Sequence, residues 1–301
     1  MKDIAVIVGN GFSIDLCSNF FPNINTSRPI DRNYIIEQQP PLMARAAFPQ
    51  VFQAWEKFKA TSDDQFEFFR SVKSKKLVEL EVEARHLLAM CYSDISLRLN
   101  IRAQWRWTRF FQSIAHRLRT AISFNYDRVL EGTFTHLGIQ YSQNEIVNNC
   151  ILLLKPHGSC NMDCNPSAIA GLIARYPLNN WLSANDYEQC LVPTQRLMQP
   201  RLEAFCILPH EQNLYKRFQW QDSIWNAMES NLSPIRHCIL IGHSYGAADQ
   251  PEIDEIVSKL ASGTVLHLCN PNPPPSYARL DAIAGAKGLQ VKRHEYEPTH
   301  I

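Results

Sequence analysis

Two short apolar runs, each ending abruptly in polar residues, constrain the fold of this chain most strongly. The first run is TAISFNYD (120–127), which ends in Asn125 and Asp127, and the second is LLLKPHGS (152–159), which ends in His157 and a glycine. A buried parallel strand has a continuously apolar interior, and its carboxyl end opens onto a crevice where ligands bind. The two runs therefore predict two strand ends that build one site from distant parts of the chain.

The same pattern of apolar run and polar turn recurs along the chain and alternates with segments of helical spacing. Strands are predicted at 3–8, 120–124, 151–155, 235–241, 264–269 and 288–293. Helices are predicted at 126–137, 215–229, 250–260 and 276–286. This alternation predicts an α/β fold, a Rossmann-like parallel sheet with helices on both faces. Right-handed crossovers bring the polar ends of the first five strands to one edge of the sheet.

Long segments interrupt this rhythm within a chain that we interpret as a single domain. Residues 48–118 contain no glycine, and their apolar residues recur at helical spacing, which predicts a large helical insertion. The aromatic residues near its end are predicted core residues: Trp105, Trp107, Phe110 and Phe111. Residues 160–212 are rich in Pro and Asn and predict a second, irregular insertion, whereas the Pro-rich residues 19–45 predict a loop over the site.

The composition argues against several functional classes. Thirty basic and 29 acidic residues give a net charge of +1. The sequence has no strongly basic stripe, so we do not expect direct binding of nucleic acid. The apolar runs are too short to span a membrane, and no cleavage-site pattern follows Met1, so we expect a cytoplasmic protein. Nine cysteines, odd in number and unevenly spaced, predict reduced thiols rather than a disulfide framework.

A glycine turn directly follows the first predicted strand and precedes an apolar stretch. It consists of Gly9, Asn10, Gly11, Phe12 and Ser13. Strand, glycine turn and helix start form the phosphate-binding layout of a nucleotide fold, because glycines let the backbone approach phosphates and the helix amino terminus supplies N–H donors. Ile14 replaces the third glycine of the full dinucleotide fingerprint, so the turn alone does not identify the ligand.

The polar strand ends together offer the groups that a dinucleotide requires. The predicted pyrophosphate and adenosine contacts are Gly9, Gly11, Ser13, Gly242, Ser244 and Asn270. As a neutral imidazole, His157 can act as a base toward a ribose hydroxyl or an attacking water, and Asn125 can hold water or ribose against a developing cation. Asp127 fits two roles equally, a ligand contact or a cap of the following helix. This set suits cleavage of the nicotinamide–ribose bond better than hydride transfer, because an oxocarbenium-like transition state requires orientation and a nearby polar oxygen.

Five motifs, in this order, resemble the sirtuin-like NAD-hydrolase family of bacterial anti-phage defence proteins: GNGFSID, SFNYDRVLE, KPHGS, IGHSYGAAD and CNP. The resemblance covers residues 4–270 except for the insertions. It implies a Rossmann-like NAD fold and cleavage of NAD to nicotinamide and ADP-ribose, with Asn125 and His157 catalytic and Asp127 facing the nicotinamide carboxamide. The NAD-binding residues predicted on this basis are Gly9, Asn10, Gly11, Phe12, Ser13, Asp15, Gly158, Gly242, Ser244 and Asn270.

The chain departs from protein-deacylating sirtuins at two points. Those enzymes hold a structural zinc with two C-x-x-C pairs, whereas this chain has one C-x-x-x-C pair, Cys160 and Cys164, and four thiolates would also require Cys190 and Cys206. The D-F-R segment that follows the glycine turn in deacylases is absent, and only Asp15 remains nearby. We therefore expect no metal, and an NAD hydrolase rather than a peptide deacylase.

Two other functions remain open. One is a non-catalytic module that binds NAD or ADP-ribose and recruits a partner. The other is a serine hydrolase with Ser244 as nucleophile, because G-x-S-x-G occurs at 242–246 between a predicted strand and a predicted helix. The base and acid of such a hydrolase would come from His267, His294 or His300 and from Asp281. We interpret His243, inside this motif, as structural.

Activation is expected to come from outside the site. The chain shows no second domain that could sense a trigger, so we expect a homo-oligomer, a separate partner such as a ring-forming ATPase or a nucleic-acid-guided protein, or both. The helical insertion at 48–118 is the candidate assembly surface.

Overall fold

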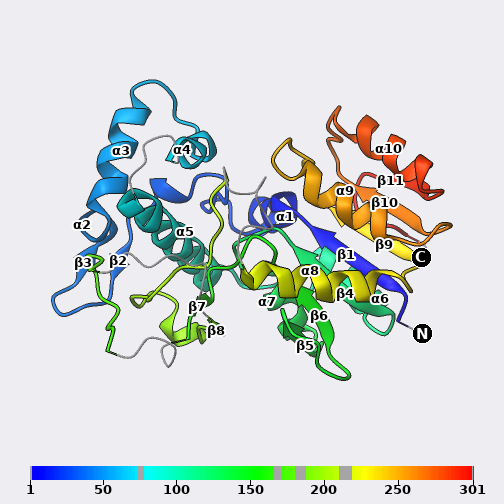
Figure 1. The fold of residues 1–301 in the computed structure, drawn as a ribbon, viewed down its shortest axis with the longest axis horizontal. Coiled ribbons are helices and arrows are strands. Elements are labelled where there is room, and N and C mark those ends of the chain that lie inside the picture. The colour runs from blue at the N-terminus through cyan, green and yellow to red at the C-terminus, as the bar shows by residue number, and fades with distance from the viewer. Residues whose placement is uncertain (1, 73–77, 166–170, 180–187, 210–218, 300) are drawn as a thin grey trace.

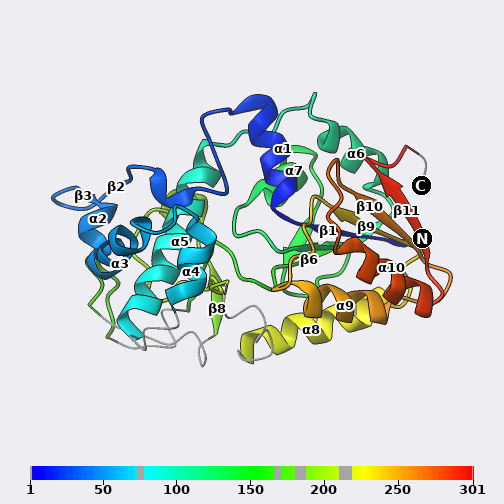
Figure 2. The same ribbon diagram turned by 90° about the horizontal axis from the view of Figure 1, so that it is seen from above.

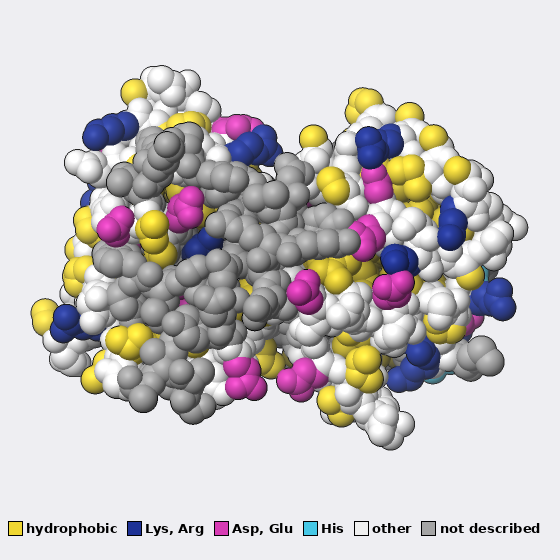
Figure 3. All heavy atoms as spheres, in the orientation of Figure 1, with side chains coloured by type: hydrophobic (Ala, Val, Ile, Leu, Met, Phe, Trp, Pro, Cys, Tyr) yellow, Lys and Arg dark blue, Asp and Glu magenta, His cyan; other side chains and the backbone are white. Residues whose placement is uncertain are grey.

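The computed structural model describes residues 2–72, 78–165, 171–179, 188–209, 219–299 and 301. These residues form two lobes, one built around a parallel sheet and the other around helices, and both chain ends lie on the sheet lobe (Figure 1). A notch separates the lobes at the surface, and Lys and Arg side chains are scattered over the face shown in Figure 3. Within the described part of the chain, no helix is both long and apolar enough to cross a membrane.

The sheet of the first lobe has seven strands in the order β11–β10–β9–β1–β4–β6–β5, and neighbouring strands are parallel. The strands are β1 (Ile4–Val8), β4 (Leu118–Ser123), β5 (Tyr141–Gln143), β6 (Ile151–Leu154), β9 (His237–Ile241), β10 (Val265–Cys269) and β11 (Gln290–His294). This topology confirms the predicted Rossmann-like α/β fold. The edge strand β5 was not predicted, because its sequence, YSQ, is only three residues long and contains no aliphatic residue.

Helices cover both faces of the sheet, as predicted (Figure 2). One face carries α8 (Gln219–Leu232), α9 (Gln250–Lys259) and α10 (Tyr277–Ala286), and the other carries α1 (Asn10–Phe20), α6 (Arg106–Ile114) and α7 (Val129–His136). Side chains of β1 alternate between these layers: Ala5 and Ile7 pack with the α8–α10 layer, and Ile4, Val6 and Val8 pack with the α1, α6 and α7 layer. Because both faces are covered, the central strands are apolar without interruption.

The second lobe contains most of the predicted helical insertion. Its elements are η1 (Pro29–Asp31), β2 (Ile35–Ile36), β3 (Leu42–Met43), α2 (Ala44–Ala47), α3 (Pro49–Lys59), α4 (Gln65–Ser71), α5 (Val78–Arg98), β7 (Met162–Cys164), β8 (Gln189–Leu191) and η4 (Thr194–Arg196). A separate apolar core holds its helices together, with Phe48 and Phe68 fully buried in it, whereas Met162 and Cys164 of β7 pack with the core of the sheet lobe. The residues 19–45 contribute Ile30, Tyr34 and Ile36 to this core. The division of the chain into one domain with two insertions stays a prediction, and parts of 160–212 and of the predicted helix 215–229 lie outside the described residues.

Helix α6, at the end of the predicted insertion, packs on the sheet and not on the helical lobe. Its aromatic residues surround Phe12 of α1, whose ring lies 4.8 Å from that of Trp105 and 6.0 Å from that of Phe111. Trp105, Trp107, Phe110 and Phe111 are all buried, which confirms their prediction as core residues.

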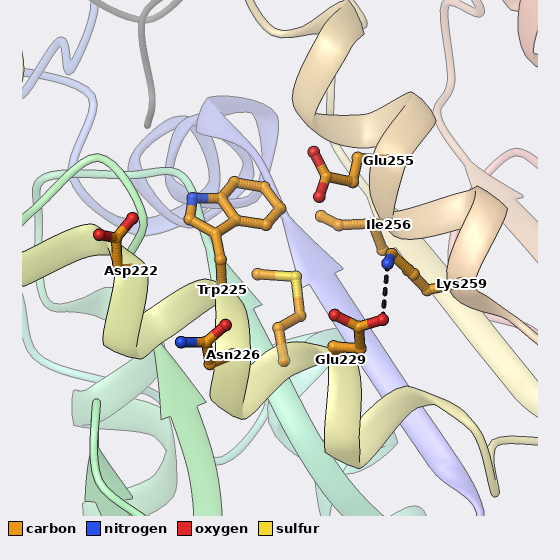
Figure 4. Close-up of a pocket in the computed structure, with 8 residues that line it drawn as sticks. Asp222, Trp225, Asn226, Glu229, Glu255, Ile256 and Lys259 are labelled. Atoms are coloured by element: carbon orange, nitrogen blue, oxygen red, sulfur yellow. Dashed lines mark hydrogen bonds and ion pairs between the residues drawn. The ribbon is translucent and has the colours of Figure 1, made fainter. Parts of the chain in front are cut away.

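A recess of about 350 Å³ lies on the outer side of the α8–α10 layer, between α8 and α9 (Figure 4). Trp225 and Ile256 face one another across it, and Lys259 is paired with Glu229 at 2.6 Å. None of the predicted site residues lines this recess.

Two glycine turns lie in direct backbone contact at the carboxyl edge of the sheet. The N–H of Gly11 donates to the carbonyl of Gly242 at 2.8 Å, and the N–H of Gly9 donates to Ile241 at 2.9 Å. Gly242 has a φ of +57°, and a Cβ added there would lie 2.5 Å from the backbone nitrogen of Phe12. A Cβ on Gly11 would lie 2.6 Å from the carbonyl oxygen of Gly242. Glycine is therefore required on both sides of this contact.

We expect Gly242→Ala to destabilise the protein more than Gly138→Ala, although both positions have positive φ. Gly138 (φ +66°) has nothing within 4 Å of an added Cβ, so its substitution incurs only backbone strain of roughly 1–2 kcal/mol. At Gly242 the added atom also meets backbone that cannot rotate away, which adds about 1–3 kcal/mol. Urea denaturation of both variants measures the difference, and equal losses would contradict the proposed close contact.

Candidate functional site

A cavity of about 720 Å³ lies between the two lobes, at the carboxyl ends of the strands. This volume falls within the range of small-molecule sites, and the carboxyl edge of an open parallel sheet is where ligands bind in such folds. The sheet lobe supplies the turns after β1, β4, β6, β9 and β10. The helical lobe closes the cavity with residues of α4, including Phe66, and with Tyr92 of α5.

Ten of the thirteen predicted site residues line this cavity. They are Gly9, Asn10, Gly11, Asp15, Asn125, Asp127, His157, Gly242, Ser244 and Asn270. The other three lie behind the cavity wall: Phe12 is in the aromatic core, Ser13 is buried beneath Asn125, and Gly158 packs against the carbonyl of Phe205. No residue of 19–45 lines the cavity, so the predicted covering loop is not what closes it.

Asn125, just after β4, is held in one orientation by its amide nitrogen. Nδ2 donates to the carbonyl of Gly9 at 3.0 Å and to Oγ of Ser13 at 3.2 Å. The side chain is only 7% exposed, and among the described residues Oδ1 has no hydrogen-bond donor. Because both amide hydrogens point away, the carbonyl oxygen is the polar group that Asn125 offers to a ligand.

Asp127 both supports the start of α7 and lines the cavity. Its Oδ1 accepts from the backbone N–H of Val129 at 3.0 Å, which is the capping role considered from the sequence. Burial raises the pKa of Asp127, and the positive charge of Lys155 and the N–H of Val129 oppose this effect only in part. Helix α7 begins at Val129 and not at Tyr126, because the backbone of Tyr126 is used elsewhere: its carbonyl accepts from the N–H of Cys160.

His157, after β6, is paired with an acid that was not predicted. Its Nε2 lies 2.6 Å from Oε2 of Glu252 in the first turn of α9, and both side chains are almost completely buried. Burial lowers the pKa of His157, but the charge of Glu252, the hydrogen bond to it and the charge of Asp249 outweigh burial, so the pKa lies above its usual value. Burial raises the pKa of Glu252, and His157 opposes this. The close carboxylate supports the raised pKa of His157.

His243, in the turn after β9, is the second buried imidazole of the cavity wall. Its Nδ1 accepts from the N–H of Tyr245 at 2.9 Å, so Nε2 carries the proton of the neutral ring and lies 3.7 Å from Oδ2 of Asp249. Phe124 packs edge-to-face against the rings of both His157 (4.9 Å) and His243 (5.2 Å). Burial lowers the pKa of His243, so this ring stays neutral more readily than His157.

Asp249 and Glu252 are the site residues that sequence reasoning missed. Glu252 falls on the apolar face of the predicted helix 250–260, four residues before the buried Ile256. An acidic side chain at a core position of an amphipathic helix is an available signal, because such a residue is buried only when paired. Together with His157, these two acids form a compact group in which one ligand atom of each lies within 4.8 Å of the others.

The backbone donors predicted for a pyrophosphate are partly occupied. The N–H groups of Gly9 and Gly11 bond to the turn after β9, as described above, and that of Phe12 bonds to the carbonyl of Gly9 at 3.0 Å. The positive end of the α1 dipole still points toward the cavity, because Gly9, Asn10 and Gly11 line it. The Asn10 side chain donates to Oγ of Ser27 at 3.3 Å.

The described residues do not assemble the serine hydrolase considered as an alternative, and the four cysteines that a sirtuin-type zinc would require are not among the groups with metal-ligand spacing in the described part of the chain. Cys160, Cys164, Cys190 and Cys206 are free thiols, and in the described part of the chain the group with metal-ligand spacing is His157, Asp249 and Glu252 instead. His267 is hydrogen-bonded to His237 at 3.2 Å and to His294 at 3.0 Å, and Asp281 pairs with Arg293. Ser244 is exposed and no described histidine bonds to its Oγ, whereas His300 lies outside the described residues.

Comparison with known proteins finds solved structures that resemble this chain. No protein-family model and no curated protein matches the chain. A structure concerning the mechanism and regulation of Sir2 enzymes is 14% identical, with a TM-score of 0.39, over 97% of this chain and 87% of that chain. A structure concerning sirtuin substrate affinity is 12% identical, with a TM-score of 0.42, over 96% and 88%. A mutant Sir2 homologue in complex with 2′-O-acetyl ADP ribose is 14% identical, with a TM-score of 0.36, over 96% and 85%. Function therefore has to be argued from the site.

We expect Glu252→Gln to lower the pKa of His157, because the amide removes the negative charge that favours the imidazolium. The free energy of unfolding should also depend on pH through His157. A histidine whose folded pKa is raised contributes stability that is fully present below its ordinary value of 6.5 and is lost as the pH rises through the folded pKa. The stability advantage of the wild type over Glu252→Gln should therefore shrink as the pH rises from 6.5.

Histidine proton NMR measures the titration, and urea denaturation at several pH values measures the stability. Glu255→Gln is the matched control, because the substitution removes the same charge from the same helix, whereas the side chain of Glu255 lines the outer recess between α8 and α9. An unchanged His157 titration in Glu252→Gln would contradict the pairing.

Proposed function

We propose that this protein is an NAD⁺ glycohydrolase that cleaves NAD⁺ to nicotinamide and ADP-ribose. One observation carries the proposal: Asn125 and His157, from the neighbouring strands β4 and β6, line one cavity beside the first glycine turn. An amide oxygen and an imidazole at that position are the groups that cleavage of the nicotinamide–ribose bond requires.

The reaction involves one bond broken and one formed. The C1′–N bond of the nicotinamide riboside breaks, and its electron pair neutralises the pyridinium nitrogen. Oδ1 of Asn125, fixed by the two bonds of Nδ2, presents a partial negative charge to the oxocarbenium-like ribose and can accept from the attacking water. Water forms the new bond to C1′, and His157 in its neutral form takes the proton that water loses.

The charge of the cavity wall supports a cationic reacting group. Among the described lining residues six are acidic, namely Asp15, Asp64, Glu67, Asp127, Asp249 and Glu295, and Arg70 is the one Lys or Arg. Arg70 is itself paired with Glu67 at 2.5 Å. A wall of carboxylates stabilises the pyridinium and the developing oxocarbenium ion, and the amino terminus of α1 is the local positive end for the pyrophosphate.

A binding module for NAD or ADP-ribose is the second candidate, and one observation favours it. In this conformation Nε2 of His157 is engaged by Glu252, so the imidazole is not free to take a proton from water. Calorimetry that detects NAD binding, combined with no nicotinamide release under any partner condition, would favour this function over hydrolysis.

We expect His157→Ala and Asn125→Ala each to reduce nicotinamide release by roughly 10²- to 10⁴-fold, the range for losing a group that acts in the transition state. His136→Ala is the matched control, because His136 is an exposed histidine at the end of α7, away from the cavity. Release is measured by chromatography under substrate saturation, and folding is checked by thermal denaturation. Equal release by wild type and by His157→Ala would remove this histidine from the mechanism.

The proposal extends to a role as an anti-phage defence effector that is held inactive until it assembles or meets a partner. The engaged state of His157 supports a resting form. If self-assembly activates the protein, nicotinamide release per protomer should rise with protein concentration in parallel with oligomer mass measured by light scattering. A constant rate per protomer across that range would exclude self-assembly and leave a separate partner as the activator.

A further inference from the structure

We propose that His157, Asp249 and Glu252 form a binding site for a divalent transition-metal ion in the wall of the cavity. The side chains come from two places, the end of β6 and the start of α9. No structural zinc cluster of cysteines is involved. The site goes beyond the proposed hydrolase function, and metal binding itself does not depend on that function.

The side-chain atoms that would bind the metal already lie close together. Nε2 of His157 lies 2.6 Å from Oε2 of Glu252, and one ligand atom each of His157, Asp249 and Glu252 lies within 4.8 Å of the other two. Nε2 of the neutral His243 carries a proton and lies 3.7 Å from Oδ2 of Asp249, so this ring stands beside the site without supplying a ligand atom. In a tetrahedral site with bonds of about 2.0–2.2 Å the ligand atoms are roughly 3.3 Å apart, so the observed spacings require only small side-chain movements.

The charge of the group favours a cation. Oε1 of Glu252 is buried, and among the described residues it has no hydrogen-bond partner. A fully buried carboxylate with one unsatisfied oxygen costs free energy unless a cation or a donor reaches it. Asp249 remains partly exposed toward the cavity, which gives an ion a path of entry.

The donor set selects the class of metal. One imidazole and two carboxylates, with a fourth position left for water, suit Zn²⁺ or Co²⁺, whereas Mg²⁺ and Ca²⁺ prefer sites made of oxygen ligands alone. His243 does not join this set, because its Nδ1 accepts from the N–H of Tyr245 and its Nε2 therefore carries the proton of the neutral ring.

Metal binding and base catalysis exclude one another at His157. A metal ion takes the Nε2 lone pair that would otherwise accept the proton from water, so a bound ion should inhibit cleavage of NAD. This consequence rests on the proposed function. Removal of the ion by a chelator should restore the reaction.

Titration of the purified protein with Co²⁺ alone, followed by visible absorption, tests the site. We expect one equivalent of Co²⁺ to give ligand-field bands without the near-ultraviolet charge-transfer band of thiolate ligation. Glu252→Gln and Asp249→Asn should each weaken binding more than about tenfold. Glu255→Gln, which removes a charge from α9 beside the recess between α8 and α9, should bind as the wild type does. Asp249→Asn keeps the test valid if Glu252→Gln fails to fold.

A thiolate band, or equal affinity in wild type and both site variants, would overturn the proposal. Measuring Co²⁺ binding and nicotinamide release separately distinguishes the metal site from the proposed hydrolase activity. Co²⁺ binding that depends on Glu252, in a protein that never releases nicotinamide, would support the metal site and contradict the hydrolase. If the protein releases nicotinamide at a rate that Zn²⁺ leaves unchanged and shows no Co²⁺ binding, the result would support the hydrolase and contradict the metal site.

Discussion

The two halves of the candidate site depend on one buried cation, Lys155. Its Nζ donates to the backbone carbonyl of Asp127 at 2.8 Å and pairs with Glu131 at 3.1 Å, and both side chains of this ion pair are at most 1% exposed. A buried charge is tolerated only when it is paired, and removing one partner typically costs about 3–5 kcal/mol. Because Lys155 directly follows β6 and Asp127 lies just after β4, this contact holds the segment that carries His157 against the segment that carries Asn125.

The glycine turns impose the second constraint, at the other side of Asn125. The carbonyl of Gly9 accepts from Asn125, while the N–H groups of Gly9 and Gly11 are bonded to the turn after β9. The glycines therefore serve close packing of two turns first, and only the helix dipole and side chains remain for an anionic ligand. The cavity therefore combines acidic side chains with the positive end of one helix dipole.

The fold was predictable because each central strand is short, apolar and followed by a polar turn, a pattern set by burial on both faces of a parallel sheet. The strand ends bearing Asn125 and His157 were predictable for the same reason. The pairing of His157 with Glu252 was not, since nothing in local spacing relates residues 95 positions apart. The orientation of the Phe12 side chain was not predictable, because the helix already begins at Asn10 and turns that ring into the aromatic core.

The chemistry of the site reduces to what occupies Nε2 of His157. The contact with Glu252 raises the pKa of His157 and so favours the imidazolium, a form that cannot act as a base. Loss of the imidazolium proton leaves a buried carboxylate and a neutral ring, and the free energy of this state is lowered by any cation that enters the cavity. Under the proposed function the cation would be the pyridinium of NAD⁺, and under the proposed metal site it would be a divalent ion. In both proposals Glu252 links the protonation state of His157 to the charge of whatever the cavity holds.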